Sequence, residues 1–249
     1  MTELSGRKAV ITGGGTGIGL ACAARLAAMG IETILMGRQL ERLEAAAATL
    51  PDARAIRCDV TDDDSVTAAF SAAGPVDILV NNAGIAAAKA FHRTSMPEWQ
   101  NIQAVNVDGL VRCTLAVIGS MRTADYARII NIASIAGLRG GAYVAPYSAS
   151  KHAVVGLTKS LSLEYAKTRL TVNAVCPGYV ETQIVEDSVA NIMAKTGRTR
   201  EEAIAELAKT NPQGRLIQPD EVAETVAWLC SPLSGSVSGQ AIMISGGAI

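Results

Sequence analysis

The feature that most constrains the fold of this chain is a regular alternation of short apolar runs with longer stretches of helical spacing. The seven predicted strands are Lys8–Thr12, Thr33–Met36, Ala53–Arg57, Val76–Val80, Arg128–Ala133, Leu170–Val175 and Ala241–Ser245. The six predicted helices are Ile18–Met29, Gln39–Leu50, Asp62–Ala73, Met96–Met121, Tyr147–Lys167 and Pro219–Cys230. Strands that alternate with helices form βαβ units, in which consecutive strands lie parallel.

A parallel sheet is covered by helices on both faces, so its strands are apolar along most of their length. The run Ile129–Ile132 fits this pattern. We therefore expect an α/β fold in which residues 1–249 form a single domain around a doubly wound, parallel seven-stranded sheet. The alternation is interrupted once, between Glu181 and Gln218, by a polar and helix-prone insertion.

Composition narrows the class of protein. Of the 249 residues, 49% are hydrophobic and 18% are charged, which is typical of a packed globular domain. The 22 basic and 23 acidic residues leave a net charge of −1, so we expect no nucleic-acid or membrane partner. Five unpaired cysteines and a start without an apolar signal-like core predict a cytoplasmic protein. His92 and His152 are isolated, so no metal site is expected.

A glycine-rich loop, Thr12 to Gly19, joins the first strand to the first helix. Backbone N–H groups at such a turn, together with the helix N-terminus, can approach a pyrophosphate closely. The strict GxGxxG pattern fails because Ile18 occupies its last glycine position, and the loop reads TGxxxGxG instead. A flexible glycine turn without a ligand is the alternative, which the position between an apolar strand and a helix disfavours.

Three polar residues predict proton-transfer chemistry. Tyr147 and Lys151 are four residues apart and therefore lie one turn apart on one helix face. A nearby ammonium lowers the pKa of a phenol from about 10, which would let Tyr147 exchange a proton with a carbonyl oxygen. Ser134 follows the fifth strand, where its hydroxyl can bond the same oxygen. A merely solvated helix face is the alternative for Tyr147 and Lys151.

Three motifs in order resemble the short-chain dehydrogenase/reductase family. They are TGxxxGxG on the first turn, Asn81-Asn82-Ala83-Gly84 after the fourth strand, and Tyr147-x-x-x-Lys151. Each motif alone is weak, but all three at the ends of the expected strands are specific, and the resemblance runs from Leu4 to Ile249. It implies a Rossmann sheet, an NAD(P)(H) cofactor, and a homotetramer built from the two long middle helices and the C-terminal strand.

The resemblance also implies roles for individual residues. Ser134, Tyr147 and Lys151 would be catalytic, and Asn106 would position a water in a proton relay; an ordinary structural asparagine is the alternative. The implied cofactor contacts are Gly13, Thr16, Gly17, Ile18, Gly19, Arg38, Asp59, Val60, Asn82, Ala83, Gly84, Tyr147, Lys151, Pro177, Gly178, Val180 and Thr182. Among them, Asp59 and Val60 resemble the pair that binds adenine.

The end of the second strand bears on the choice of coenzyme. NAD-dependent members of the family usually carry an aspartate where this chain has Gly37, to accept the two ribose hydroxyls. Arg38 follows, where it can pair with a 2′-phosphate. The basic residue that some NADP enzymes carry inside the glycine loop is replaced here by Thr16. We therefore favour NADP(H), with NAD(H) and a merely solvated Arg38 as the alternatives.

The loops expected around the pocket carry small residues, in Ile85–Ala88 and Ile135–Gly141. The chain is most similar to 3-oxoacyl-thioester reductases, which act on acyl-carrier-protein or CoA substrates, and to polyketide ketoreductases. This implies hydride transfer between NADP(H) and a ketone or secondary alcohol, most of all a 3-oxoacyl thioester or related β-keto substrate. The alternatives are an NAD-dependent secondary-alcohol or 3-hydroxyacyl-CoA dehydrogenase and a nucleotide-sensing Rossmann protein without catalysis.

Two further segments carry expectations. The insertion at residues 183–216 follows Thr182 directly, so we expect a mobile substrate lid whose apolar residues roof the pocket. Arg128 matches a residue that carrier-protein reductases use for docking, but a capping or solvated arginine is the favoured interpretation. Cys176 is expected to be a small apolar filler.

Overall fold

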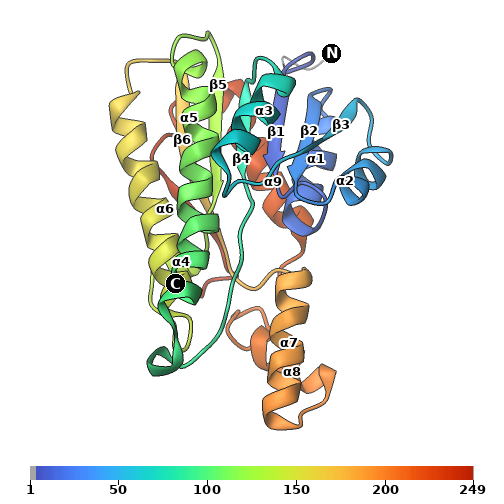
Figure 1. Ribbon diagram of the computed structural model, residues 1–249, viewed down its shortest axis with the longest axis vertical. Helices are drawn as coiled ribbons and strands as arrows, with labels where there is room; N and C mark the ends of the chain where they lie inside the picture. Colours follow the sequence, from blue (N-terminus) through green and yellow to red (C-terminus); the bar gives the residue numbers. More distant parts are fainter. Residues whose placement is uncertain (1–3, 249) are drawn as a thin grey trace.

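The computed structural model describes residues 4–248, which form one seven-stranded sheet between two layers of helices (Figure 1). The strand order is β3-β2-β1-β4-β5-β6-β7, and every pair of neighbours is parallel. The strands are β1 (Lys8–Thr12), β2 (Glu32–Gly37), β3 (Ala53–Arg57), β4 (Ile78–Asn81), β5 (Ala127–Ile132), β6 (Leu170–Pro177) and β7 (Ala241–Ile244). The predicted doubly wound α/β fold is confirmed.

The α-helices are α1 (Gly17–Ala27), α2 (Leu40–Ala47), α3 (Asp63–Ala73), α4 (Met96–Gln103), α5 (Gly109–Met121), α6 (Ala145–Glu164), α7 (Gln183–Thr196), α8 (Arg200–Ala208) and α9 (Pro219–Cys230). One apolar core lies between the sheet and α1, α2 and α9. A second core lies between the sheet and α3 and α5 on the other face. Because both faces are covered, β1, β4 and β5 are buried along almost their whole length.

The site is positioned by the point at which the strand order reverses. Because β1 lies between β2 and β4, the crossovers that leave β1 and β4 run to opposite sides of the sheet. The crevice between them, beyond the carboxyl ends of the strands, is where doubly wound folds bind ligands. The glycine loop follows β1, and Asn82–Gly84 follow β4, so two of the sequence motifs meet there.

The helix predicted over Met96–Met121 has these bounds in the structure, but it contains a π-helical turn at Ala104–Asp108, between α4 and α5. A π turn takes one extra residue, and such turns are frequent at functional sites. Asn106 lies within it and is buried. Within residues 4–248, this stretch is also the one helical segment long and apolar enough to cross a membrane by length and composition. Here α5 packs on the sheet through Cys113 and Val117.

Arg128 is a capping arginine, in line with the favoured interpretation, and it is neither solvated nor accessible for docking. Arg128 as a whole is 3% exposed, and its guanidinium carbon lies 4.3 Å from the centroid of the Tyr126 ring. The guanidinium donates to the carbonyl oxygens of Ala127 at 2.8 Å, of Arg169 at 3.2 Å and of Ser231 at 3.4 Å. A buried charge is tolerated where such acceptors and an aromatic face replace water. Arg128 therefore joins β5 to the C-terminal end of α9.

The insertion forms the hairpin α7–α8, which projects away from the sheet (Figure 1). Its two ends are joined by a parallel bridge between Val180 and Ile217. Most of its apolar residues do not face the pocket, contrary to the expected roof: Val185, Val189, Ala203 and Leu207 form a small core between the two helices. Ile184 is the exception, because it lines the pocket described next.

Candidate active site

The glycine loop has the backbone that close approach to a ligand requires. Gly13 and Gly17 have positive φ values of 64° and 53°, which side chains strongly disfavour. A Cβ on Gly17 would lie 3.0 Å from Thr182. At Gly19 a Cβ would overlap the carbonyl oxygen of Gly13. The loop is therefore closed tightly on itself and on the segment after β6, as a phosphate-binding turn must be.

Two side chains join this loop to the end of β4. The Thr12 hydroxyl accepts hydrogen bonds from the backbone N–H groups of Asn82 and Ala83, both at 3.0 Å. In return, the Asn82 amide donates to the carbonyl oxygens of Thr12 and Gly13, at 3.0 and 3.1 Å. Three predicted cofactor-contact residues, Gly13, Asn82 and Ala83, are thus brought together by direct hydrogen bonds.

The N-terminus of α1 fits an anionic group. Its first turn carries no acidic residue, and its N-cap residue, Thr16, makes no side-chain cap. By contrast, α3 is capped by Asp62, and α4 and α8 begin with capping boxes. The first N–H groups of a helix need acceptors and carry the positive end of its dipole. In α1 no side chain of the N-cap residue occupies these groups, which leaves room for a ligand, and Ile18, in that turn, lines the pocket.

The end of β2 carries positive charge. Arg38 is exposed. The pKa of Asp59 lies below its usual range, mainly because its carboxylate accepts hydrogen bonds from Thr61 and in smaller part because Arg38 and Arg57 are close by. The stem of Arg42, on α2, lies close to the glycine loop, where a Cβ on Gly15 would be 3.6 Å from its Cγ. These arginines form a surface suited to a phosphate at the position predicted from Arg38.

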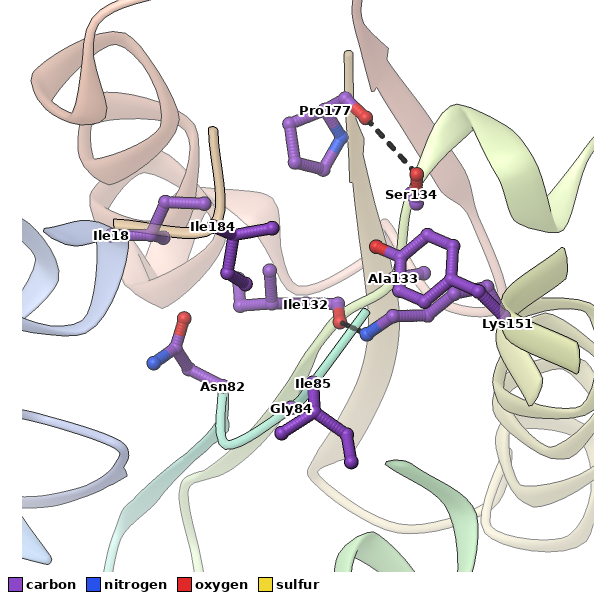
Figure 2. Close-up of a pocket in the computed structure, with 11 residues that line it drawn as sticks. Ile18, Asn82, Gly84, Ile85, Ile132, Ala133, Ser134, Lys151, Pro177 and Ile184 are labelled. Atoms are coloured by element: carbon purple, nitrogen blue, oxygen red, sulfur yellow. Dashed lines mark hydrogen bonds between the residues drawn. The ribbon is translucent and has the colours of Figure 1, made fainter. Parts of the chain in front are cut away.

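The three predicted catalytic residues line one pocket of about 80 Å³, together with Asn82, Gly84 and Pro177. Figure 2 shows Ser134 and Lys151 on one side of this pocket, with Ile18 and Asn82 opposite. Ser134 is buried, and its hydroxyl accepts from the N–H of Ala136 at 3.1 Å. It also donates to the Pro177 carbonyl oxygen at 3.5 Å (Figure 2). Ser134, Tyr147 and Lys151 are therefore brought together in space, whereas Asn106, the fourth residue predicted to take part in catalysis, does not line this pocket.

The pKa of Tyr147 moves in the direction opposite to the one expected. Burial raises the pKa of its phenol, and the hydrogen bond with Ser134 opposes this only in part. The ammonium of Lys151 lies 5.7 Å from the centroid of the Tyr147 ring and donates to the Ile132 carbonyl oxygen at 2.8 Å (Figure 2). Desolvation therefore dominates, and the phenol keeps its proton at neutral pH.

Lys151 is the charged group most deeply placed in the pocket. It is 5% exposed, and burial lowers the pKa of its ammonium to about 8. The neighbouring thiol of Cys176 is fully buried, and burial raises its pKa to about 11. Cys176 is thus a neutral filler, as expected. The ammonium has two donors beyond its bond to Ile132, which can serve groups that enter the pocket.

Asn106 is bonded to the wall of the pocket. Its side-chain oxygen accepts from the N–H of Ile85 at 2.8 Å, and its amide donates to the Ile85 carbonyl oxygen at 2.9 Å. The same amide donates to Ser150 at 3.0 Å, and the Ser150 hydroxyl donates to the Tyr147 carbonyl oxygen at 2.7 Å. The side chain of Asn106 therefore fixes the loop after β4 against the helix that carries Tyr147.

Four further predicted cofactor-contact residues are held by local contacts. Val60 packs against Gly109, where a Cβ would be 2.7 Å from its side chain. Gly178 donates its N–H to Ile244 at 2.9 Å, and Val180 pairs with Ile217. Thr182 caps no backbone group of α7, and its hydroxyl donates to the Val180 carbonyl oxygen at 3.2 Å.

Sequence reasoning did not identify several residues that shape this site. Ser150 was missed because a serine inside a helix carries no signal of its own. Arg42 was missed because its approach to Gly15 depends on the packing of α2. The pocket-lining residues Ile132 and Ala133 stand at and just after the end of β5, in an apolar run whose pattern does not show which side chains face the crevice.

The pKa of Lys151 makes stability depend on pH. An unfolded lysine binds its proton up to about pH 10.5, whereas this one releases it near 8 in the folded chain. Between these values the unfolded chain binds more protons, so folding becomes more favourable as pH rises. Lys151→Met should therefore raise the free energy of unfolding at pH 7, relative to wild type, by up to ~3 kcal/mol more than at pH 10.

Denaturant unfolding of both proteins between pH 7 and pH 10 measures this difference. Lys159→Met, on the exposed side of the same helix, is the control and should differ from wild type by the same amount at every pH. A constant difference for Lys151→Met would show that the lysine is not buried in its charged form.

Comparisons with known proteins agree with this geometry. Residues 7–193 match the family model described as short chain dehydrogenase. A ketoacyl reductase assigned to the monensin polyketide synthase of Streptomyces virginiae is 40% identical, over 99% of this chain and 98% of its own length. The 3-oxoacyl-[acyl-carrier-protein] reductase of Aquifex aeolicus is 34% identical, over 98% and 95%.

A solved structure of a tryptophan variant of actinorhodin polyketide ketoreductase, with NADPH, superposes with a TM-score of 0.93. It is 38% identical, and the match covers 100% of this chain and 99% of that one. Sequence, fold and the arrangement of the pocket thus lead to one conclusion. The chain belongs to the short-chain dehydrogenase family.

Proposed function

We propose that this protein is an NADP(H)-dependent ketone reductase whose substrates carry a β-keto group. The observation that carries the proposal is the convergence of a phenol, a hydroxyl and an ammonium, from Tyr147, Ser134 and Lys151, on one pocket beside the glycine loop. Acid catalysis next to a dinucleotide-binding turn is the arrangement that carbonyl reduction needs. When bound, the nicotinamide supplies the hydride.

Tyr147 is the proposed proton donor. Because burial raises the pKa of its phenol, the group is protonated at neutral pH, which suits reduction better than oxidation. Ser134 is proposed to donate a hydrogen bond to the same carbonyl oxygen and so to stabilise the negative charge that develops there. It is buried at the end of β5 and already hydrogen-bonded to Ala136, so its position is fixed before a substrate arrives.

Lys151 is proposed to favour the release of the proton from Tyr147 and to bond the cofactor ribose. Its charge lies beside the ring, and charge of this sign stabilises a phenolate as it forms. Asn106 is proposed to keep the loop at Ile85 in place and so to hold the far wall of the pocket. The relay water implied by the family resemblance would lie between Asn106 and Lys151, near Gly84.

The cofactor is proposed to extend from Ile18 across Asn82 to Arg38, through the cofactor contacts predicted from the sequence. NADP(H) is favoured because Gly37 supplies no carboxylate to repel a 2′-phosphate and Arg38 lies exposed beside it. The related actinorhodin ketoreductase was solved with NADPH. The β-keto class of substrate is supported by the ketoacyl and 3-oxoacyl reductases among the relatives.

The first prediction tests the proton donor. Tyr147→Phe should keep the fold and cofactor affinity but lower kcat by at least ~10³, since its hydroxyl acts only as the transition state forms. Steady-state kinetics with NADPH and a β-keto ester measure this, and NADPH titration of the variant is the control. A variant with a tenth of the wild-type kcat would exclude Tyr147 as the donor.

The second prediction tests the coenzyme. Arg38→Ala should weaken NADPH binding by about 1.5–3 kcal/mol, the range for a hydrogen bond to a charged group, and leave NADH binding nearly unchanged. Arg122→Ala, an exposed arginine at the end of α5, is the control and should alter neither affinity. Equal losses for the two coenzymes, or a wild-type preference for NADH, would contradict the assignment.

We also propose that the chain forms a homotetramer through α5, α6 and β7. These elements expose apolar side chains that a monomer would leave in water: Leu115 at 67%, Leu163 at 79% and Met243 at 45%. Sedimentation velocity should give about four times the chain mass of 25.8 kDa, and Leu163→Glu should yield smaller species. A monomer at micromolar concentration would contradict this.

The hairpin α7–α8 is proposed to act as a substrate lid. It has its own small core and a stem at Val180 and Ile217, so it can move as a body, and Ile184 would move with it against the substrate. Hydrogen exchange of residues 183–216 should slow on addition of NADPH and product. Equal protection with and without ligands would indicate a static pair of helices.

A further inference from the structure

Four buried polar side chains in the core form a network of hydrogen bonds that the proposed mechanism does not use. Asn81 on β4 and Asn131 on β5 are register partners, and the Asn81 amide donates to the Asn131 side-chain oxygen at 3.0 Å. The same amide donates to the Thr114 hydroxyl on α5 at 3.1 Å. The Asn131 amide donates in turn to the Thr158 hydroxyl at 2.9 Å, and each of the four residues is at most 5% exposed. The network thus runs from α5 through two strands to α6, the helix that carries Tyr147 (Figure 1).

This network is costly to bury. The side-chain oxygen of Asn81 is buried and accepts no hydrogen bond from any residue within 4–248. A polar group that leaves water without finding a partner loses free energy, and a buried network with such a member is less favourable than an apolar core of the same shape. The network is therefore better explained by what it positions than by the stability that it contributes.

The helix α6 needs such a link because its buried face is mostly polar. Its buried residues are Pro146, Ser148, Ser150, Lys151, Val154, Val155, Thr158 and Ser162. Apolar contacts are non-directional, so the few that α6 makes through Val154 and Val155 fix its position along its own axis poorly. A hydrogen bond fixes that position better, because it weakens steeply as its distance and angle change.

Thr158 and Lys151 join one face of α6 to neighbouring residues of β5. They are seven residues apart, which is close to two helical turns. The Lys151 ammonium donates to the Ile132 carbonyl oxygen at 2.8 Å, and Thr158 accepts from Asn131, the residue before Ile132. The Thr158 hydroxyl also donates to the Val154 carbonyl oxygen at 2.8 Å, which fixes its orientation. The helix is thus bonded to the strand at two levels.

We propose that Asn131 and Thr158 are positioning residues, which set α6 along β5 and so place the phenol of Tyr147 against the Ser134 hydroxyl. Ser134 follows Asn131 by three residues at the end of the strand, and Tyr147 precedes Thr158 by eleven, or close to three helical turns. A shift of α6 along its axis moves the phenol away from that hydroxyl, and a misplacement of about 1 Å can cost ~10²-fold in rate. The proposal rests on the proposed ketone reductase function and assigns part of it to residues outside the pocket.

The two ends of the network provide a matched test. Thr158 holds α6, whereas Thr114 makes the equivalent hydrogen bond from α5, which carries neither Tyr147 nor Lys151. Thr158→Val and Thr114→Val each keep the shape of the side chain and leave one buried amide N–H without its acceptor. Both variants should therefore lower Tm by a similar amount.

Only Thr158→Val should impair catalysis. Its kcat for a β-keto ester with NADPH should fall ~10-fold or more while KM for the ketone changes less than about threefold, and Thr114→Val should stay within about threefold of wild type in both. Thr158→Ser keeps the hydroxyl and should restore kcat. In a Ser134→Ala background, Thr158→Val should lower kcat by no more than about threefold, since the hydroxyl against which the phenol is placed is absent.

Asn131→Leu provides a second variant, should Thr158→Val fail to fold. It removes both hydrogen bonds at the centre of the network, but Thr158 keeps its bond to Val154 and Asn81 keeps its bond to Thr114. Each partner thus retains one hydrogen bond. Asn131→Leu should lower kcat as Thr158→Val does, again with little change in KM.

Equal losses of kcat in Thr158→Val and Thr114→Val, or a wild-type kcat in Thr158→Val, would overturn the positioning role. A loss that Thr158→Ser does not restore, or that is undiminished in the Ser134→Ala background, would overturn it as well. A wild-type protein that does not reduce the β-keto ester would instead overturn the proposed function, and the positioning role with it. The two failures are distinguishable, because the first requires turnover by the wild-type protein and the second excludes it.

Discussion

The hydrogen bonds between the ends of β1 and β4 are the constraint on which the rest of the site depends. Thr12 and Asn82 bond each other's backbones at the point where the two crossovers part. Backbone groups that leave a sheet lose their partners, and here two side chains replace them. Both loops consequently keep one conformation outside the sheet, and the glycine turn and the far wall of the pocket share a common support.

The chemistry of the pocket follows from how little water reaches it. Burial raises the pKa of Tyr147 and lowers that of Lys151, so both groups move toward their neutral forms. At neutral pH the shift of Lys151 costs stability, whereas that of Tyr147 does not, because the phenol is protonated in the folded and the unfolded chain alike. Shifts of this kind are a feature of sites that handle protons. The same dry surroundings strengthen every hydrogen bond that Ser134 or Lys151 makes with a bound group. Burial of Lys151 thus lowers the stability of the fold and at the same time strengthens the hydrogen bonds available to a bound group.

Sequence reasoning predicted the sheet and the convergence of Ser134, Tyr147 and Lys151 on one pocket, because both follow from periodicity and from motifs at strand ends. It failed where the outcome depends on contacts between distant residues. Arg128 can be buried because its guanidinium lies over the Tyr126 ring and donates a hydrogen bond to the carbonyl oxygen of Ser231. Ser231 is 103 positions away in the chain. The direction of the Tyr147 pKa likewise depends on desolvation by the folded chain. The apolar residues of the insertion can be recognised in the sequence, but the sequence does not show that α7 and α8 bury them against each other.

The π turn at Ala104–Asp108 requires a fixed number of residues between α4 and α5. Each residue in an α-helix turns the chain by about 100°. A single deletion here would allow a continuous α-helix, but it would rotate one half of the stretch against the other. Either Asn106 would swing away from Ile85, or Cys113 would leave the sheet. This stretch should therefore accept changes of side chain far more readily than changes of length.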